Sequence, residues 1–403
     1  MVFWSAPNPT QEKFWRTMAQ EYMKDHPGVQ VDVSPMPESP SSEAGILTAL
    51  ASGTKLTASE NVFVGFGAQL VKSQAIVPLD TLQGYSDLIR SRKAEQLVAG
   101  WKFPDGHQYI LPLYSNAMLY AWRMDILKQL GYQEPPRTYG EILALGQKLK
   151  SKYPDKYVLA RKVLVDPNSW WERWFDFFTL YDAASDGAPF LNGTEVVADR
   201  AAVTKVMSFY KELDDKGYLL TKDATDPFET GLAVWNVVGP WTLPYWKEKY
   251  PELKVGDNVV LTPPPVPDDF PAGKTPKTFA DSKGVVIYRN ASPAEQQAAW
   301  EFIKWVLSDP RHDLTWLEMT GLPPARGDLT TDPVFRQYLA QNPGLAQYAG
   351  AVPTGVPPIQ NEKFADLYTL MGERLMVPVL TGRKSPALAF DDMKAAWAEV
   401  LKR

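Results

Sequence analysis

Clearly marked helix starts alternate with short apolar runs along the first two thirds of this sequence, and this alternation limits the fold more than any other feature. Asn8, Pro9 and Gln11 predict a capping box, with asparagine at the N-cap, proline at the first helical position and an amide three residues after the cap. Residues 138–141 and 292–295 predict two more capping boxes, each before an amphipathic segment. Because strands and helices alternate until a mostly helical end, we expect an α/β fold with mainly parallel sheets.

Other segments fit the same pattern. Residues 29–33 alternate valine with polar residues and predict a strand, while residues 203–213 predict an amphipathic helix. Residues 226–229 predict a short helix before a strand-like run at 233–238. No fixed-period repeat is present, so a solenoid is not expected.

Length and composition narrow the class of protein. A chain of 403 residues exceeds one compact core of ordinary size, so two lobes are expected. A net charge of −5 without a run of Lys and Arg argues against nucleic-acid binding. No apolar stretch is long enough to span a membrane. The absence of cysteine excludes disulfides, thiolate metal sites and cysteine nucleophiles.

The start of the sequence allows two locations. Val2, Phe3 and Trp4 predict a strand directly after Met1, and no signal segment precedes them. Either the protein is cytoplasmic, or this sequence begins after a signal segment that has been removed.

A glycine-containing turn at residues 65–67 partly matches the pattern of a nucleotide site. Gly65, Phe66 and Gly67 follow a strand-like run and open a predicted helix, as a dinucleotide fingerprint would. Leu70 replaces the third glycine of that fingerprint, which weakens the match. The milder interpretation is that the backbone approaches a ligand closely at the two glycines.

The sequence gives little support for a catalytic site or a metal site. His26, His107 and His312 are the only histidines, and none has a second histidine at metal-ligand spacing. No nucleophile elbow supports a serine hydrolase. A glycoside hydrolase remains the enzyme alternative, with Glu172 as its best single carboxylate, but Arg173 beside it favours an ion pair and no partner carboxylate stands out. We expect no catalytic residues, no cofactor and no metal.

Aromatic residues make up 12% of the chain, and two aromatic segments suggest a sugar site. Trp170 and Trp174 lie on one face of a predicted helix, whereas Trp171 points about 100° away, so at least one of the three is expected to face a cleft. Trp241 follows a buried strand and a Gly-Pro break, which places it at a strand end where α/β proteins bind ligands. A tryptophan face matches the apolar face of a pyranose ring.

Short motifs spread over nearly the whole chain resemble the family 1 extracellular solute-binding proteins, the group that includes maltose-binding protein. Each match is loose, but they occur in the family's order, at residues 26–31, 75–80, 105–112, 119–127, 131–141, 231–241, 298–303 and 321–326.

The resemblance implies a periplasmic-binding-protein-like fold: two α/β lobes that hold a ligand in the cleft between them. It places residues 1–113 and 285–326 in an N-terminal lobe and residues 117–281 and 329–403 in a C-terminal lobe. The hinge crossings are then expected near 112–116, 281–284 and 326–329. Positions carried over from the family as ligand-binding are Asn8, Gly65, Phe66, Gly67, Asn116, Trp170, Trp171, Trp241, Asp281 and Arg326. Asn116 stands where relatives often carry an acid, which leaves the exact sugar open.

The same resemblance implies a function. It predicts the monomeric substrate-binding component of a bacterial ABC sugar importer, which closes on a sugar and docks on transmembrane permease subunits. Its location would be periplasmic or extracytoplasmic, with a lipid anchor in the native precursor as one form of attachment. Clustered tryptophans favour a di- or oligosaccharide; a polyol or glycerophosphodiester is the alternative ligand, because fold alone does not choose.

Overall fold

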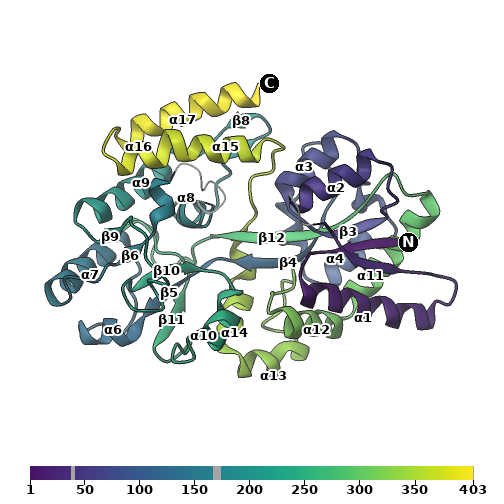
Figure 1. Ribbon diagram of the computed structural model, residues 1–403, viewed down its shortest axis with the longest axis horizontal. Helices are drawn as coiled ribbons and strands as arrows, with labels where there is room; N and C mark the ends of the chain where they lie inside the picture. The colour runs from purple at the N-terminus through teal and green to yellow at the C-terminus, as the bar shows by residue number, and fades with distance from the viewer. Residues whose placement is uncertain (38–40, 167–173, 403) are drawn as a thin grey trace. The chain divides into compact units, whose positions relative to one another are not determined.

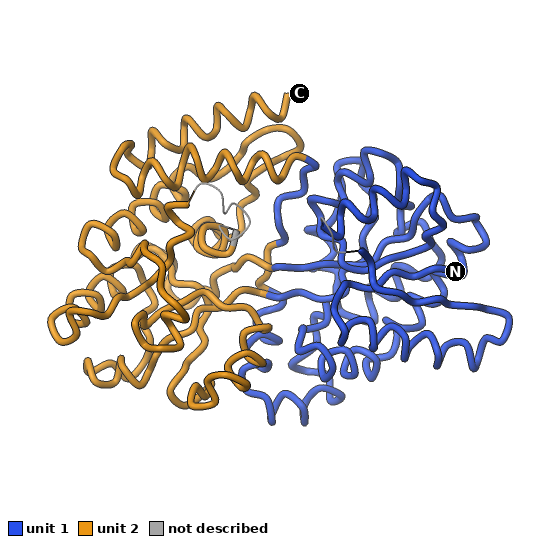
Figure 2. The backbone as a smooth tube through the Cα atoms, in the orientation of Figure 1, with its two compact units in different colours: residues 1–116, 281–353, 357–362 blue, residues 117–280, 354–356, 363–403 orange. Residues whose placement is uncertain are grey.

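The structure, a computed structural model, describes residues 1–37, 41–166 and 174–402, and the chain forms two compact units (Figure 2). Unit 1 comprises residues 1–116, 281–353 and 357–362, and unit 2 comprises residues 117–280, 354–356 and 363–403. Both units combine helices with sheets.

Two of the chain's passages between the units occur inside strands. The first falls at residues 116/117 in β4 (Leu111–Ala117), and the second at 280/281 in β12 (Thr278–Ile287). The third passage lies further along the chain than the crossing that we expected at 326–329, because residues 327–353 remain in unit 1. There α12 (Pro310–Thr320), α13 (Pro333–Gln341) and α14 (Pro343–Ala351) pack in succession, and the chain leaves only at residue 353.

The unit 1 sheet is largely parallel, as expected. Its strand order is β12-β3-β1-β2, with β4 pairing β12, while β13 (Gly355–Val356) pairs with the part of β12 that belongs to unit 2. The central strand β1 (Val2–Ser5) pairs in parallel with β2 (Asp32–Pro35) and β3 (Ala58–Val62), whereas β12 runs antiparallel to β3. The strand β2 thus lies further along the chain than the predicted segment 29–33, of which only the last two residues belong to it.

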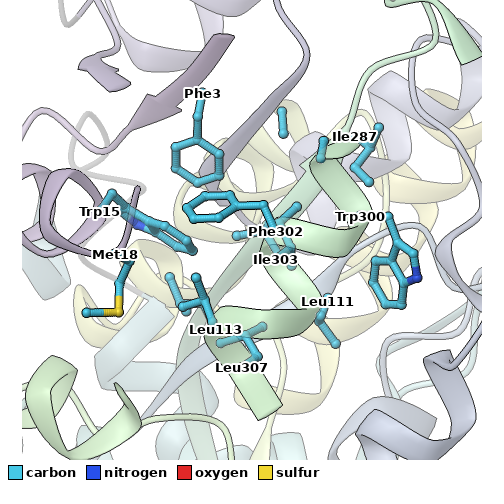
Figure 3. Packing of buried hydrophobic residues seen from close by; sticks show 14 of the residues in the cluster. Phe3, Trp15, Met18, Leu111, Leu113, Ile287, Trp300, Phe302, Ile303 and Leu307 are labelled. Carbon is cyan, nitrogen blue, oxygen red and sulfur yellow. The ribbon is translucent and has the colours of Figure 1, made fainter. Parts of the chain in front are cut away.

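Helices cover the unit 1 sheet, with α1 packed on α11 and with α2 and α3 on the other side of the strands from α1 (Figure 1). The core joins rings from β1, α1 and α11: Phe3 lies 4.3 Å from Trp15 and 6.1 Å from Phe302, centroid to centroid (Figure 3). The helices of this unit are α1 (Pro9–Asp25), α2 (Ser42–Ala51), α3 (Val64–Lys72), α4 (Tyr85–Ser91), α5 (Glu95–Ala99), α11 (Pro293–Ser308), α12 (Pro310–Thr320), α13 (Pro333–Gln341) and α14 (Pro343–Ala351).

The principal sheet of unit 2 is antiparallel, which corrects the expectation of mainly parallel sheets for this part of the chain. It has the order β10-β5-β11, with stacked rings of Tyr120 and Trp235 4.7 Å apart on neighbouring strands. Alternation of strands and helices along the sequence does not reveal strand direction, because pairing is decided between distant segments. The strands are β5 (Leu119–Arg123), β6 (Leu159–Ala160), β7 (Leu191–Asn192), β8 (Glu195–Val196), β9 (Leu219–Leu220), β10 (Trp235–Val238), β11 (Val259–Thr262) and β13 (Gly355–Val356).

Helices from the end of the chain complete unit 2. The final helix α17 packs on α9 and lies beside α15 (Figure 1). The α-helices are α6 (Met124–Gln129), α7 (Tyr139–Lys152), α8 (Thr179–Ser185), α9 (Arg200–Asp215), α10 (Thr242–Lys249), α15 (Phe364–Met371), α16 (Val377–Leu380) and α17 (Pro386–Leu401). A π-helical turn, η4 (Trp174–Phe178), leads into α8.

Local helix-start signals were confirmed where side chains make the cap. Two of the three expected capping boxes form, at Thr138 with Glu141 and at Ser292 with Glu295. The box expected at Asn8 is wrong in part: Asn8 caps the helix, but the Gln11 side chain donates to Glu60 instead of returning to the cap. The short helix expected at 226–229 is wrong: these residues form turns, and Asp226 has a φ of +45° that an α-helix does not accommodate.

Candidate functional site

Polar residues of unit 1 gather where several strands reach the same edge of its sheet. The carboxyl ends of the parallel strands β1 and β3 meet there, and the amino end of β12 joins them because β12 is antiparallel to β3. Strand β4 also ends there, because Ser115 Oγ lies 3.0 Å from Ser282 Oγ. We call Asn8, Glu60, Asn116, Asp281 and Lys283 the unit 1 polar edge. Ligands of α/β proteins commonly bind at such a strand edge.

Asn8 lies in the turn after β1 and caps the helix that follows it. Its Oδ1 accepts hydrogen bonds from the backbone N–H of Thr10 at 3.0 Å and of Gln11 at 3.4 Å, which caps α1. The Gln11 side chain does not return to the cap; it donates to Glu60 Oε2 at 3.1 Å. Asn8 is nevertheless exposed, so its amide nitrogen is accessible to a ligand.

Asn116 and Asp281 are brought together by the pairing of β4 with β12. Asn116 is 2% exposed, and its Oδ1 has no hydrogen-bond partner within the described part of the chain. An unpaired buried amide oxygen is costly, so it marks a position where a donor from a ligand or water is expected. Asp281 is partly exposed; burial raises the pKa of its carboxyl, and Lys283 lowers it.

The glycine turn expected to approach a ligand instead packs inside unit 1. Residues 65–67 form the first turn of α3, and Phe66 is 1% exposed. A side chain at Gly67 would collide with Ile110, so the glycine is explained by packing. This geometry favours a structural role for Phe66 and Gly67 over ligand contact.

Arg326 is also engaged within unit 1. It is 3% exposed, and its guanidinium donates to Asp313 Oδ2 at 3.0 Å and to both oxygens of Asp328 at 2.8 and 3.0 Å. Asp313 is in turn held by Arg92. The donors of Arg326 are therefore used by the protein itself, and Arg326 has no part in the ligand site proposed below.

Unit 2 contributes aromatic surface. Trp241 follows β10 and the Gly-Pro break and is 41% exposed, in contrast to the other described tryptophans that the core encloses, such as Trp235 and Trp246. Its indole lies over Gly239, where any side chain would collide with the ring. Phe175, on the π-helical turn η4, lies 5.7 Å from Trp241 and 6.0 Å from Phe279. We call Trp241 and Phe175 the unit 2 aromatic platform, which the buried Phe279 supports from beneath.

The aromatic run that precedes this turn lies partly outside the described residues. Trp170 and Trp171, expected to bind ligand, and Glu172, the glycosidase candidate, belong to the residues that the structure does not describe. Phe175 was not singled out from sequence, because a phenylalanine in a long aromatic run cannot be assigned to core or surface by spacing alone.

A hollow of about 350 Å³ lies elsewhere on unit 2, lined by basic and acidic residues including Arg161, Lys162 and Asp166. Arg161 donates to both carboxylate oxygens of Asp176 at 2.9 Å. Asp176 is the chain neighbour of Phe175, so this ion pair fixes the turn that carries the platform.

The described part of the chain offers neither a metal-binding cluster nor a membrane-spanning helix. Within residues 1–37, 41–166 and 174–402, no cluster of three or more His, Asp or Glu side chains could hold a metal ion. No helix of that part of the chain is long and apolar enough to cross a membrane.

Comparison with known proteins identifies the family. Residues 17–345 match the family model described as bacterial extracellular solute-binding protein. This chain belongs to that family. Members bind solutes and are not enzymes, and the family's description places them outside the cytoplasm.

Individual relatives agree with this placement. A maltotriose-binding protein of Pyrococcus abyssi is 22% identical over 83% of this chain and 68% of its own length. The structure of an uncharacterized protein of Listeria monocytogenes is 48% identical, with a TM-score of 0.96 and 99% of each chain covered. A cyclic α-maltosyl-1,6-maltose-binding protein of Arthrobacter globiformis is 19% identical, covers 100% of this chain and 98% of its own, and has a TM-score of 0.84. The last likeness confirms the two-lobe periplasmic-binding-protein fold.

Proposed function

We propose that this protein is the substrate-binding component of an ABC importer and that its ligand is a neutral oligosaccharide of the maltodextrin class. The observation that carries the proposal is the exposed indole of Trp241, held against Phe175 at the end of strand β10. An aromatic face that is open to solvent can stack on the apolar face of a pyranose ring.

The polar edge of unit 1 supplies the complementary chemistry. Sugar hydroxyls are both donors and acceptors, and this edge offers an unpaired amide oxygen at Asn116, a carboxylate at Asp281 and an ammonium at Lys283. A site with aromatic stacking surfaces and a few polar groups is typical of carbohydrate binding.

The names of two relatives support the choice of ligand class. One binds maltotriose and the other a cyclic maltosyl-maltose, both built from several rings. The exposed Trp241 and the partly exposed Phe175 also offer stacking surface for more than one ring. A polyol or glycerophosphodiester would leave much of the platform uncovered.

Calorimetric titration tests the proposal directly. Maltose, maltotriose and maltotetraose are titrated into the purified protein, with glycerol and glycerophosphocholine as comparison ligands. We expect a dissociation constant in the micromolar range or below for a malto-oligosaccharide, and the sugar should be recovered intact by chromatography. Binding only of the phosphodiester, or release of shorter sugars, would contradict the proposal and favour the other ligand class or a hydrolase.

Closure of the two units on the ligand belongs to the same proposal. Ligand contacts made by both units stabilise a closed form over an open one. Small-angle scattering with and without saturating maltotriose should therefore show a smaller radius of gyration with sugar. We propose that the protein is a monomer and that its closed form docks on the permease. We also propose that the native precursor is attached by a lipid anchor.

A further inference from the structure

One charged residue interrupts the aromatic sequence of the π-helical turn η4 in unit 2. The turn reads Trp-Phe-Asp-Phe-Phe, so four of its five residues are aromatic and Asp176 is the exception. Asp176 is 1% exposed. Because a buried carboxylate is strongly unfavourable unless it is paired and hydrogen-bonded, Asp176 can lie only where the protein supplies its partners.

Two other elements of unit 2 hold Asp176. Arg161, which follows β6, donates from Nε to both carboxylate oxygens at 2.9 Å each. The hydroxyl of Tyr210, on helix α9, donates to the backbone carbonyl of Asp176 at 2.7 Å. The side chain and the backbone of this residue are therefore attached to different parts of the unit.

The phenylalanines on either side of Asp176 have different surroundings. Phe175 is partly exposed and lies 5.7 Å from Trp241, whereas Phe177 and Phe178 are buried. Apolar burial alone would not determine which ring faces Trp241, because similar apolar residues fill a core position almost equally well. The carboxylate does determine it, because Asp176 must meet Arg161.

The π-helical geometry makes a fixed register important. Single π-helical turns are rare and occur frequently at functional sites. Polar groups inside a protein are best known for fixing one register where apolar packing allows several. The pair of Arg161 and Asp176 is suited to this role, since it joins η4 to the end of β6.

We propose that Arg161 is a positioning residue of the ligand site. By binding Asp176 it selects the register of η4 in which Phe175 packs against Trp241. The inference rests on the oligosaccharide-binding function, in which the unit 2 aromatic platform stacks on the sugar. Arg161 acts through Asp176 and Phe175 and needs no contact of its own with the ligand. Tyr210 supports the same register from the backbone.

Replacing both charges with apolar side chains tests the proposal on the full chain. Arg161→Met combined with Asp176→Leu should leave the melting temperature near that of the wild type, because apolar replacement of a buried ion pair is often neutral or stabilising. Maltotriose binding in calorimetry should nevertheless be about 3- to 10-fold weaker, because Phe175 is no longer held beside Trp241. A merely structural role would change stability and leave the affinity of the folded protein unaltered.

A second background and two controls show whether the effect passes through Phe175. Phe175→Ala alone should weaken binding about 3- to 10-fold, and adding the double replacement should cost less than about 2-fold more. Arg161→Lys keeps the charge and should retain part of the affinity. The matched control is Arg123→Met with Asp125→Leu, which removes another ion pair of unit 2, with Nη2 and Oδ2 2.6 Å apart, and should leave affinity unchanged.

The outcomes separate this inference from the function on which it rests. Wild-type affinity in the folded double variant overturns the positioning role and leaves oligosaccharide binding intact. The same loss in the Phe175→Ala background, or an equal loss in the Arg123 control, also overturns it. A wild-type protein that binds none of the malto-oligosaccharides overturns the function and this inference with it. If the double variant does not fold, Tyr210→Phe replaces it, with an expected loss of about 2- to 5-fold that disappears in the Phe175→Ala background.

Discussion

Arg326 donates from Nη1 to Asp313 Oδ2 at 3.0 Å, and both residues are almost fully buried, with 3% and 2% of their surfaces exposed. Arg92 binds the same carboxylate at 2.8 and 3.0 Å. One acidic side chain of α12 thus joins the end of α4 to the segment that follows residue 325. This network keeps that segment inside unit 1, so the chain does not leave the unit where we first expected.

Replacing Arg326 with methionine should destabilise unit 1 without changing ligand affinity. Removing one partner of a buried ion pair leaves unbalanced charge inside the protein and typically costs about 3–5 kcal/mol of unfolding free energy. Urea unfolding measures that loss. The control Arg200→Met breaks an exposed pair with Asp391 and should change stability by no more than about 1 kcal/mol. Weak maltotriose binding by a stable Arg326→Met protein would return Arg326 to the ligand site.

Gly284 should not tolerate even a methyl group. A Cβ there would collide with the backbone carbonyl of Leu111 on the neighbouring strand, and backbone atoms cannot move aside as a flexible side chain can. Gly284→Ala should therefore lower the unfolding free energy by about 1–3 kcal/mol, as overpacking usually does. Gly28→Ala is the matched control, since nothing lies within 4 Å of its added carbon and its melting temperature should barely change.

Glu60 should make stability fall as pH rises across neutrality. Burial raises its pKa in the folded state to about 7, above the ordinary value of 4.5. The protonated carboxyl therefore contributes stability that is fully present below about pH 4.5 and is lost as pH rises through about 7. Compared with Glu60→Gln, which does not titrate, the wild type should lose on the order of 3 kcal/mol between pH 4 and pH 8. Urea midpoints at both pH values measure the difference, and parallel profiles for the two proteins would show that Glu60 stays charged.

The parts of the fold that could be predicted from sequence are those decided by neighbouring residues. The capping boxes at Thr138 and Ser292 depend on side chains three residues apart, so their patterns are sufficient. The antiparallel direction of the unit 2 sheet, and the retention of residues 327–353 in unit 1, depend on contacts between distant segments. Local patterns contain no signal for either.

The candidate site also contains residues that could be predicted from their sequence neighbours and residues that depend on contacts between distant segments. Trp241 could be predicted because a Gly-Pro break after an apolar strand projects the next side chain outward. Glu60 and Lys283 could not, since one acidic and one basic residue 223 positions apart become neighbours only through the register of β3 with β12. Arg326 shows the limit of a motif position: the motif predicts a ligand contact, but the carboxylates of Asp313 and Asp328 already accept hydrogen bonds from its guanidinium.

Trp241→Ala should reduce affinity while leaving the fold intact. The indole is 41% exposed, so its removal opens no large cavity, but it takes away the surface on which a sugar ring would stack. A loss of about 1.5–3 kcal/mol of stacking corresponds to roughly 10- to 150-fold weaker maltotriose binding in calorimetry. Trp246→Ala is the matched control: that ring is 1% exposed, and truncating a buried tryptophan typically lowers the unfolding free energy by about 3–5 kcal/mol. The folded fraction of the Trp246 variant should keep its affinity. If Trp241→Ala instead loses stability on the scale of Trp246→Ala and still binds sugar normally, the platform supports the core of unit 2 and does not bind the ligand.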